Sequence, residues 1–152
     1  MSSFAFKMIH NILPTKTRLY RMNLENSPKC VLCDSDTDED LSHALIECSF
    51  NGLINDWILA VLFDIDPSLL NTELNSGDIV SFDIPLDAEN KLPVVWFLLS
   101  VFQIIWNCRS SRKAVSFVNV KSSIEAELHM MKKTKFKHKF DHIESALNFV
   151  MF

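Results

Sequence analysis

The chain has 152 residues, of which 48% are hydrophobic and 22% charged, and a formal net charge of −4. This length and apolar content allow a buried core and exclude wholesale disorder. The presence of only two glycines argues against glycine-rich phosphate loops and turn-rich all-β folds. Four cysteines are too few for a disulfide scaffold, and residues 1–13 lack the pattern of a secretory signal. We therefore expect an intracellular protein, in the nucleus, the cytoplasm or both, that is not secreted.

Apolar spacing predicts two short helices at the N-terminus. Phe4, Met8 and Ile12 recur at helical intervals before Pro14, which stops the first helix. Thr15 then stands where it can cap a second short helix.

The middle of the chain mixes helical and irregular patterns. Capping-box spacing from Thr37 to Asp40 predicts a helix over residues 38–47, and a further helix is expected over residues 50–63. Proline and asparagine, which interrupt regular structure, recur in residues 64–92. This segment is therefore predicted to be an irregular acidic connector with one short helical turn and one short strand at residues 79–82.

Three apolar patterns follow in the C-terminal part. Residues 92–106 are apolar nearly all round but shorter than the ~20 residues that span a bilayer, so we expect a buried core helix, continuing towards Arg112, and no membrane partner. Residues 117–131 predict the next helix. The last segment carries a heptad-like seam of Phe136, Phe140, Ile143, Leu147 and Val150. We expect this seam to be an internal core stripe of a monomer rather than a homodimer interface through residues 136–150.

The sharpest chemical signal is Cys30-x2-Cys33-x9-His43-x4-Cys48. Three thiolates and one imidazole suit the tetrahedral coordination of zinc and leave no open position, so the pattern predicts one structural Zn²⁺. Two alternatives are a redox Cys-x-x-Cys motif, although no βαβ pattern surrounds it, and a coincidence of spacing. Cys108 lies in the apolar helix and is expected to be a buried thiol that binds no metal.

The His43-x4-Cys48 spacing sets a geometric condition. In a regular α-helix, residues five apart point about 140° away from one another. We therefore expect Cys48 to lie where its helix unwinds.

These predictions combine into an all-α fold: a small zinc-stabilised helical domain with a CCHC site near the N-terminus and a C-terminal helical bundle. We expect residues 1–63 to form the zinc-binding subdomain, residues 64–92 the connector, and residues 93–152 a helical region packed on it as one compact unit.

Several segments, taken in order, resemble the reverse-transcriptase zinc-binding domain, which lies C-terminal to the polymerase in LINE-type non-LTR retrotransposon proteins. The shared features are residues 6–15, which end in Leu-Pro-Thr, residues 18–22, the cysteine–histidine cluster and Trp57. Residues 105–110 also resemble the Trp-x-x-Arg segment found downstream in that family. The resemblance implies a non-catalytic zinc-binding module of reverse-transcriptase origin that assists RNA or DNA binding in a retroelement ribonucleoprotein. A polymerase region is a further implied partner, since the chain contains none.

The distribution of charge partly supports nucleic-acid binding. Residues 1–30 carry a net charge of +4, residues 31–90 of −14 and residues 91–152 of +6. We expect phosphate contacts from basic residues of the two outer segments. These candidates are Lys7, Lys16, Arg18, Arg21, Lys132, Lys133, Lys135, Lys137 and Lys139. The alternative is a protein–protein interaction or purely structural module that binds no nucleic acid.

Three residues offer the alternative of a nuclease. Asp83, Glu89 and Lys91 resemble the carboxylate–carboxylate–lysine set of restriction-like nucleases. That chemistry needs its glutamate and lysine on a strand beside a metal-binding aspartate, whereas Leu92-Pro93 follow here and predict a helix start. We therefore expect no enzymatic activity.

Overall fold

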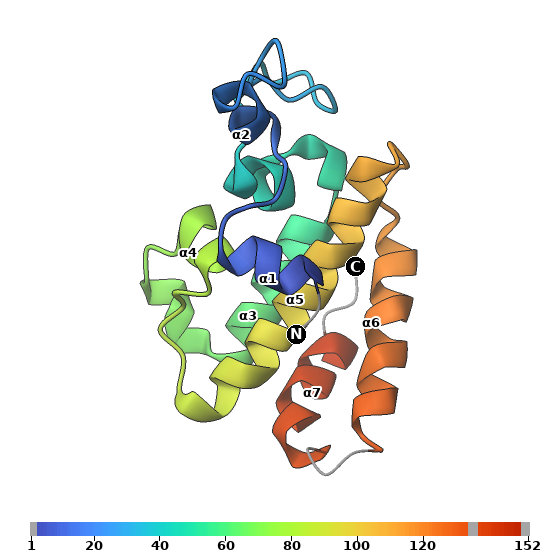
Figure 1. Ribbon diagram of the computed structural model, residues 1–152. Helices are drawn as coiled ribbons and strands as arrows, with labels where there is room; N and C mark the ends of the chain where they lie inside the picture. The colour runs from blue at the N-terminus through green and yellow to red at the C-terminus, as the bar shows by residue number, and fades with distance from the viewer. Residues whose placement is uncertain (1–2, 134–136, 150–152) are drawn as a thin grey trace. The chain divides into compact units, whose positions relative to one another are not determined.

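The computed structural model describes residues 3–133 and 137–149 (Figure 1). The structure is helical over 67% of its residues, and its described part contains no β-strand, which confirms the all-α fold. The one extended pairing among these residues is an isolated antiparallel bridge between Lys29 and Asp38.

The chain divides into two compact units, each assembled from separate stretches of sequence. The first consists of Met1–Gly52, Asn75–Asp83 and Phe102–Val115, and the second of Leu53–Leu74, Ile84–Val101 and Ser116–Phe152. Helix α5 (Ala88–Ser110) contributes residues to both. The linear division into residues 1–63, 64–92 and 93–152 stays a prediction.

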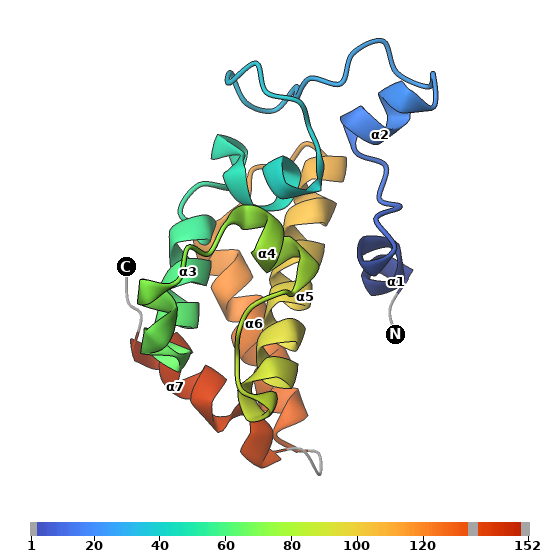
Figure 2. The same ribbon diagram turned by 90° about the vertical axis from the view of Figure 1, so that its left-hand side faces the viewer.

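The first unit begins with the two predicted short helices, α1 (Ser3–Ile9) and α2 (Lys16–Arg21). Thr15 caps α2 as predicted, because its hydroxyl oxygen accepts a hydrogen bond from the Arg18 N–H. A long irregular loop then leads to the π-helix η1 (His43–Glu47), as Figure 2 shows, and a 3-10 turn at Ser49–Asn51 follows.

Two predictions about this unit are wrong, both because of capping. The helix expected over residues 38–47 starts later: the Asp40 carboxylate accepts the His43 N–H at 2.8 Å, while Asp38 is held extended by its bridge to Lys29. The strand expected at residues 79–82 is helix α4 (Ser76–Ser81). Asn75 and Asp78 form a reciprocal capping box that starts this helix.

The second unit is a helical bundle around the N-terminal part of α5. Its members are α3 (Ile54–Ile65), the 3-10 turn Pro67–Asn71, α6 (Phe117–Met131), the 3-10 turn Lys137–Phe140 and α7 (Asp141–Phe149). Helix α3 starts four residues later than predicted, whereas α6 confirms its predicted bounds. Figures 1 and 2 show α6 and α7 beside this part of α5, and α7 packs against both α3 and α6.

Aromatic side chains form the centre of this bundle. Trp57 is fully buried, and its ring meets Phe97 and Phe117 edge-on at centroid distances of 5.3 and 5.5 Å. Phe140, Ile143 and Leu147 of the predicted seam are also buried within the unit, whereas Phe136 and Val150 lie outside the described residues.

Helix α5 is longer than predicted, at 23 residues. It is the one helix in the described part of the chain that is long and apolar enough to cross a membrane, a criterion that core helices of soluble proteins also meet. Val94, Phe97, Val101 and Ile105 recur every three or four residues and are almost fully buried. These residues form the core-facing stripe expected of a packed helix. The absence of a membrane partner stays a prediction.

Substitution on α5 tests this packing. Phe97→Ala leaves a cavity beside Trp57, so we expect it to lower the free energy of unfolding by about 3–5 kcal/mol. The control is Leu92→Ala on the same helix, whose side chain is 53% exposed and which we expect to change stability by less than about 0.5 kcal/mol. Urea titration of the zinc-loaded protein measures both, and equal losses would contradict the packing.

Candidate metal centre

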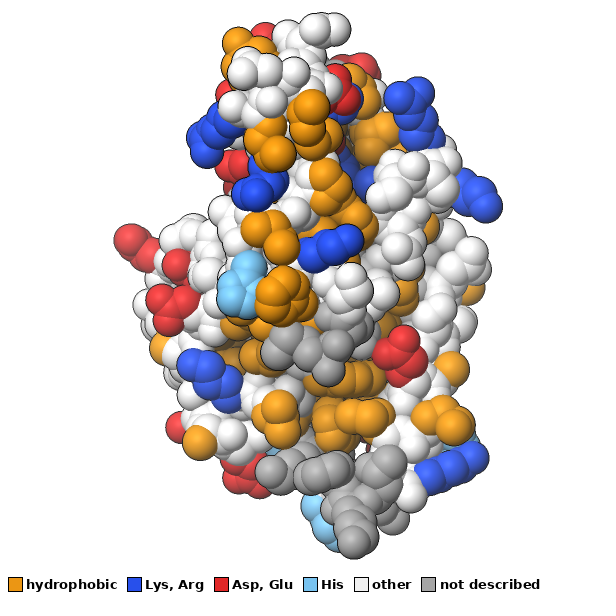
Figure 3. All heavy atoms as spheres, viewed as in Figure 1, with side chains coloured by type: hydrophobic (Ala, Val, Ile, Leu, Met, Phe, Trp, Pro, Cys, Tyr) orange, Lys and Arg blue, Asp and Glu red, His pale blue; other side chains and the backbone are white. Residues whose placement is uncertain are grey.

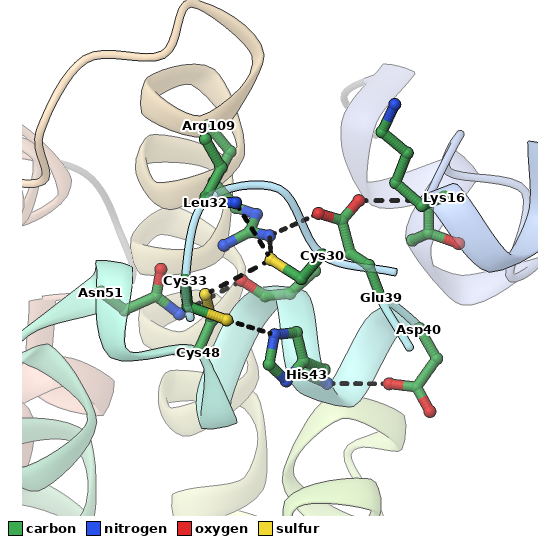
Figure 4. A network of polar contacts seen from close by, with 12 residues as sticks. Lys16, Cys30, Leu32, Cys33, Glu39, Asp40, His43, Cys48, Asn51 and Arg109 are labelled. Atoms are coloured by element: carbon green, nitrogen blue, oxygen red, sulfur yellow. Dashed lines mark hydrogen bonds and ion pairs between the residues drawn. The ribbon is translucent and has the colours of Figure 1, made fainter. Parts of the chain in front are cut away.

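Four potential ligands converge in the first unit (Figure 4). Cys30 and Cys33 lie in the loop after α2. His43 is the first residue of the π-helix η1, and Cys48 is the residue directly after it. Their ligand atoms all lie within 4.8 Å of one another. The Cys30 and Cys48 sulfurs are 3.8 Å apart, and the Cys33 sulfur is 3.3 Å from His43 Nε2.

These separations fit tetrahedral zinc. Zn–S bonds of about 2.3 Å in a tetrahedron place two sulfurs about 3.8 Å apart, and the shorter Zn–N bond brings sulfur and nitrogen to about 3.5 Å. The observed distances of 3.8 and 3.3 Å agree with this geometry. Cys30, His43 and Cys48 are buried and Cys33 is half-buried, which suits a closed structural site.

The π-helix explains how His43 and Cys48, five residues apart, can face the same centre. Its characteristic bond runs five residues, from the Cys48 N–H to the His43 carbonyl, at 2.9 Å. The wider turn brings Cys48 back towards His43, which a regular α-helix would not do. Cys48 itself has extended backbone angles, which confirms that it lies where the helix unwinds. The buried Asn51 side-chain amide then donates to the Ala44 carbonyl near the helix end, at 3.1 Å.

The pKa values of two of the cysteines are shifted in opposite directions, because hydrogen bonding dominates at Cys33 and burial dominates at Cys48. Partial burial raises the pKa of Cys33, but hydrogen bonds from the Ser35 hydroxyl and backbone and from the neighbouring cysteines outweigh it and lower the pKa to about 6. Burial raises the pKa of Cys48 to about 11, against opposing contributions from Arg109 and the Phe50 backbone. Zinc binds cysteine as the thiolate, so the lowered pKa of Cys33 favours metal binding and the raised pKa of Cys48 opposes it.

Arg109 of α5 supplies a positive charge beside the cluster, as Figure 4 shows. Its side chain is buried, and its Nη2 donates to the Cys30 sulfur at 3.5 Å and to the Glu39 carboxylate at 2.7 Å. Burial lowers the pKa of Arg109, but hydrogen bonds to Cys48 and Cys30 and the charge of Glu39 outweigh it, so the net shift is upward. Three thiolates around Zn²⁺ leave one net negative charge, which a fixed guanidinium stabilises.

Glu39 joins three parts of the unit. One carboxylate oxygen accepts from Arg109, and the other accepts from the Lys16 N–H at 3.2 Å. The Glu39 carbonyl accepts from the Thr17 N–H at 3.1 Å. The start of α2, the cysteine loop and the end of α5 therefore meet at this buried residue.

Sequence reasoning missed Arg109 and Glu39 as parts of the centre. The signal for Arg109 was present in the resemblance of residues 105–110 to a Trp-x-x-Arg segment, but no local spacing connects it to Cys30, which lies 79 positions away. Cys108 lies outside the cluster, as predicted, but is half-buried rather than buried, because the side chain turned towards the site is that of its neighbour Arg109.

The structure places the predicted nucleic-acid contacts in different situations. Lys7 and Arg21 are exposed and make no ion pair with a described residue, whereas Lys16 pairs with Glu25 and Lys132 with Glu144. Arg18 is half-buried, and Lys133 is exposed in the second unit. The side chains of Lys135, Lys137 and Lys139 lie outside the described part of the structure.

Residues 1–54 match the family model described as zinc-binding in reverse transcriptase. The match contains all four potential ligands and confirms the resemblance found in the sequence. Together with the geometry of the cluster, it supports one structural zinc ion held by this module. No curated protein and no solved structure matches the chain.

Removal of zinc is expected to unfold the first unit. Structural zinc of this kind contributes about 10 kcal/mol or more to folding, which exceeds the stability of most small domains. A strong chelator should therefore abolish amide protection in residues 23–48 and lower the melting temperature. Cys48→Ser should have the same effect, and Cys108→Ser should retain zinc. An unchanged melting curve together with a zinc content near zero by elemental analysis would refute the assignment.

Arg109 is expected to strengthen zinc binding. Arg109→Met keeps the length of the side chain but removes its charge and hydrogen bonds, so zinc affinity should fall about 10- to 100-fold. Arg109→Lys should fall in between, because lysine keeps the charge but loses the planar fork. Competition with a chromogenic chelator measures the affinities, with Lys113→Met, an exposed cation of the same unit, as the control. An affinity of Arg109→Met within twofold of the unchanged protein would contradict this role.

Proposed function

We propose that this zinc-stabilised module binds RNA or single-stranded DNA without catalytic activity and assists a retroelement reverse transcriptase. The observation that carries the proposal is the match of residues 1–54 to the zinc-binding family of reverse transcriptases. Such an enzyme works on an RNA template and a DNA product, so a module beside it is exposed to both. We infer a polymerase region as a second partner and an intracellular setting, in the nucleus or cytoplasm.

The charges of the first unit support this function. Lys7 and Arg21 extend into solvent with no carboxylate partner among the described residues, so they are free to neutralise phosphates. Two acidic residues of this unit, Asp36 and Asp38, lie in the cysteine loop, where both pair with Lys29. This loop is therefore an unfavourable surface for a polyanion, and the face of α1 and α2 is the favourable one.

The residues of the nuclease alternative lie in a different context from the one that chemistry needs. Glu89 and Lys91 are in the first turns of helix α5, not on a strand, and Asp83 belongs to the loop after α4. A structural zinc ion with four protein ligands also offers no open position for a substrate. Both observations support a binding role.

Salt dependence tests the proposed function. With three to five phosphate contacts on a single strand, the affinity should fall about 20- to 130-fold between 50 and 200 mM salt. Fluorescence anisotropy of a labelled single-stranded RNA, measured with the zinc-loaded full chain, gives this slope. The chelated protein is the control and should bind weakly. Undetectable binding at 50 mM salt would refute the proposal and favour a protein–protein interaction or purely structural module.

A further inference from the structure

A cavity lies in the first unit, apart from the residues of the metal cluster. Its walls come from the end of α1, from α2, from residues 40–42 and from α4, and its volume is about 620 Å³. This size is within the range of about 300–1,000 Å³ typical of sites that enclose a small organic ligand. Its lining includes apolar side chains, such as Met8 and Phe82, and polar ones, such as Thr17 and Ser42.

Two arginines give the cavity a positive character. Arg18 and Arg21 both line it and stand one helical turn apart on α2. Arg18 uses its Nη1 to donate to the Asn11 carbonyl at 2.9 Å, and neither arginine pairs with a carboxylate of a described residue. Asp40 is the one acidic residue lining the cavity in the described structure, and one of its carboxylate oxygens already accepts the His43 N–H. The balance of charge therefore favours an anion.

A buried hydroxyl adds a second polar group. Thr17 lines the cavity, and its Oγ1 is buried with no hydrogen-bond partner among the described residues. An unpartnered buried polar atom is unfavourable unless something satisfies it. A ligand that brings hydrogen-bonding oxygens and nitrogens would relieve this cost.

The two helices that carry these cavity residues, α1 and α2, also expose aromatic and apolar side chains. Phe6 and Tyr20 are 50% and 47% exposed, and the Phe6 ring stacks at a tilt on His10 with centroids 4.4 Å apart. Ile9 and Met22 line the cavity and are also about half exposed. Figure 3 shows hydrophobic, basic and histidine side chains together over α1 and α2. A polar or charged ligand alone does not explain exposed aromatic rings, whereas nucleobases stack on them.

We propose that the cavity lined by α1, α2 and α4 is the site where a single-stranded nucleic acid binds. Arg18 and Arg21 contact its phosphates, Thr17 hydrogen-bonds to the nucleotide in the cavity, and Phe6 and Tyr20 stack on adjacent bases. A duplex fits this surface poorly, because its base faces are already stacked inside the helix and cannot reach the exposed rings. This inference rests on the proposed function and names the surface and the strandedness of the ligand.

Anisotropy titrations with a labelled 12-nucleotide RNA and its duplex test the site, using the zinc-loaded full chain. Arg21→Glu should weaken binding of the single strand at least tenfold, and Phe6→Ala or Tyr20→Ala about five- to 150-fold each. The control Lys113→Glu makes the same charge change at an exposed position of the same unit that does not line the cavity. It should weaken binding less than threefold. Zinc content and melting temperature, measured for each variant, confirm that the first unit is folded.

The outcomes separate this inference from the proposed function. If the chain binds RNA but Arg21→Glu and Phe6→Ala bind as tightly as the unchanged protein, the site is wrong and the function stands. Equal affinity for single strand and duplex would overturn the single-strand assignment. Displacement of RNA by polyglutamate at equal charge concentration would show that the cavity recognises negative charge alone. Absence of any RNA binding at 50 mM salt would overturn both.

Discussion

The convergence of four ligand atoms on one point organises a segment that has little else to fold it. Within residues 23–40, only Cys30 and Glu39 are buried, so this loop contributes almost no apolar core. Zinc coordination supplies the missing free energy, because a closed Cys3His site stabilises a short irregular segment more strongly than burial of a few side chains. The π-helix that follows serves the same site, because its hydrogen bond across five residues lets His43 and Cys48 face the same centre.

The charge of the centre determines what must surround it. Three thiolates exceed the charge of one Zn²⁺, and a buried excess charge is costly without a partner. Arg109 meets this need from the C-terminal end of α5, and Glu39 balances Arg109 in turn. Because Glu39 also accepts hydrogen bonds from the backbone of α2, the orientation of that helix depends on the same network. The metal centre and the proposed binding cavity therefore share a support, which predicts that loss of zinc also disturbs α2.

The net charge of −4 for the whole chain does not show how unevenly charge is distributed within the first unit. In its cysteine loop, Asp36 and Asp38 pair with Lys29, whereas α1 and α2 carry both exposed aromatic rings and two cations, Lys7 and Arg21, that pair with no carboxylate of a described residue. The acidic loop repels a polyanion and the cations of α1 and α2 attract it. The local electrostatic potential therefore determines where a polyanion binds. For this reason total charge and isoelectric point are poor guides to the partner of such a module.

The sequence by itself determined the helical class, the bounds of α6 and the convergence of Cys30, Cys33, His43 and Cys48 at one centre. These features depend on spacings within one helix or one loop, which a periodic pattern records directly. The capping box of Asn75 and Asp78 is equally local, and overlooking it leads to the wrong prediction of a strand at residues 79–82. Only the tertiary structure decided that Arg109 faces Cys30, that α5 contributes to two units, and that α1, α2 and α4 line one cavity. Those features join residues far apart in the chain, and local spacing carries no information about which distant segments pack together.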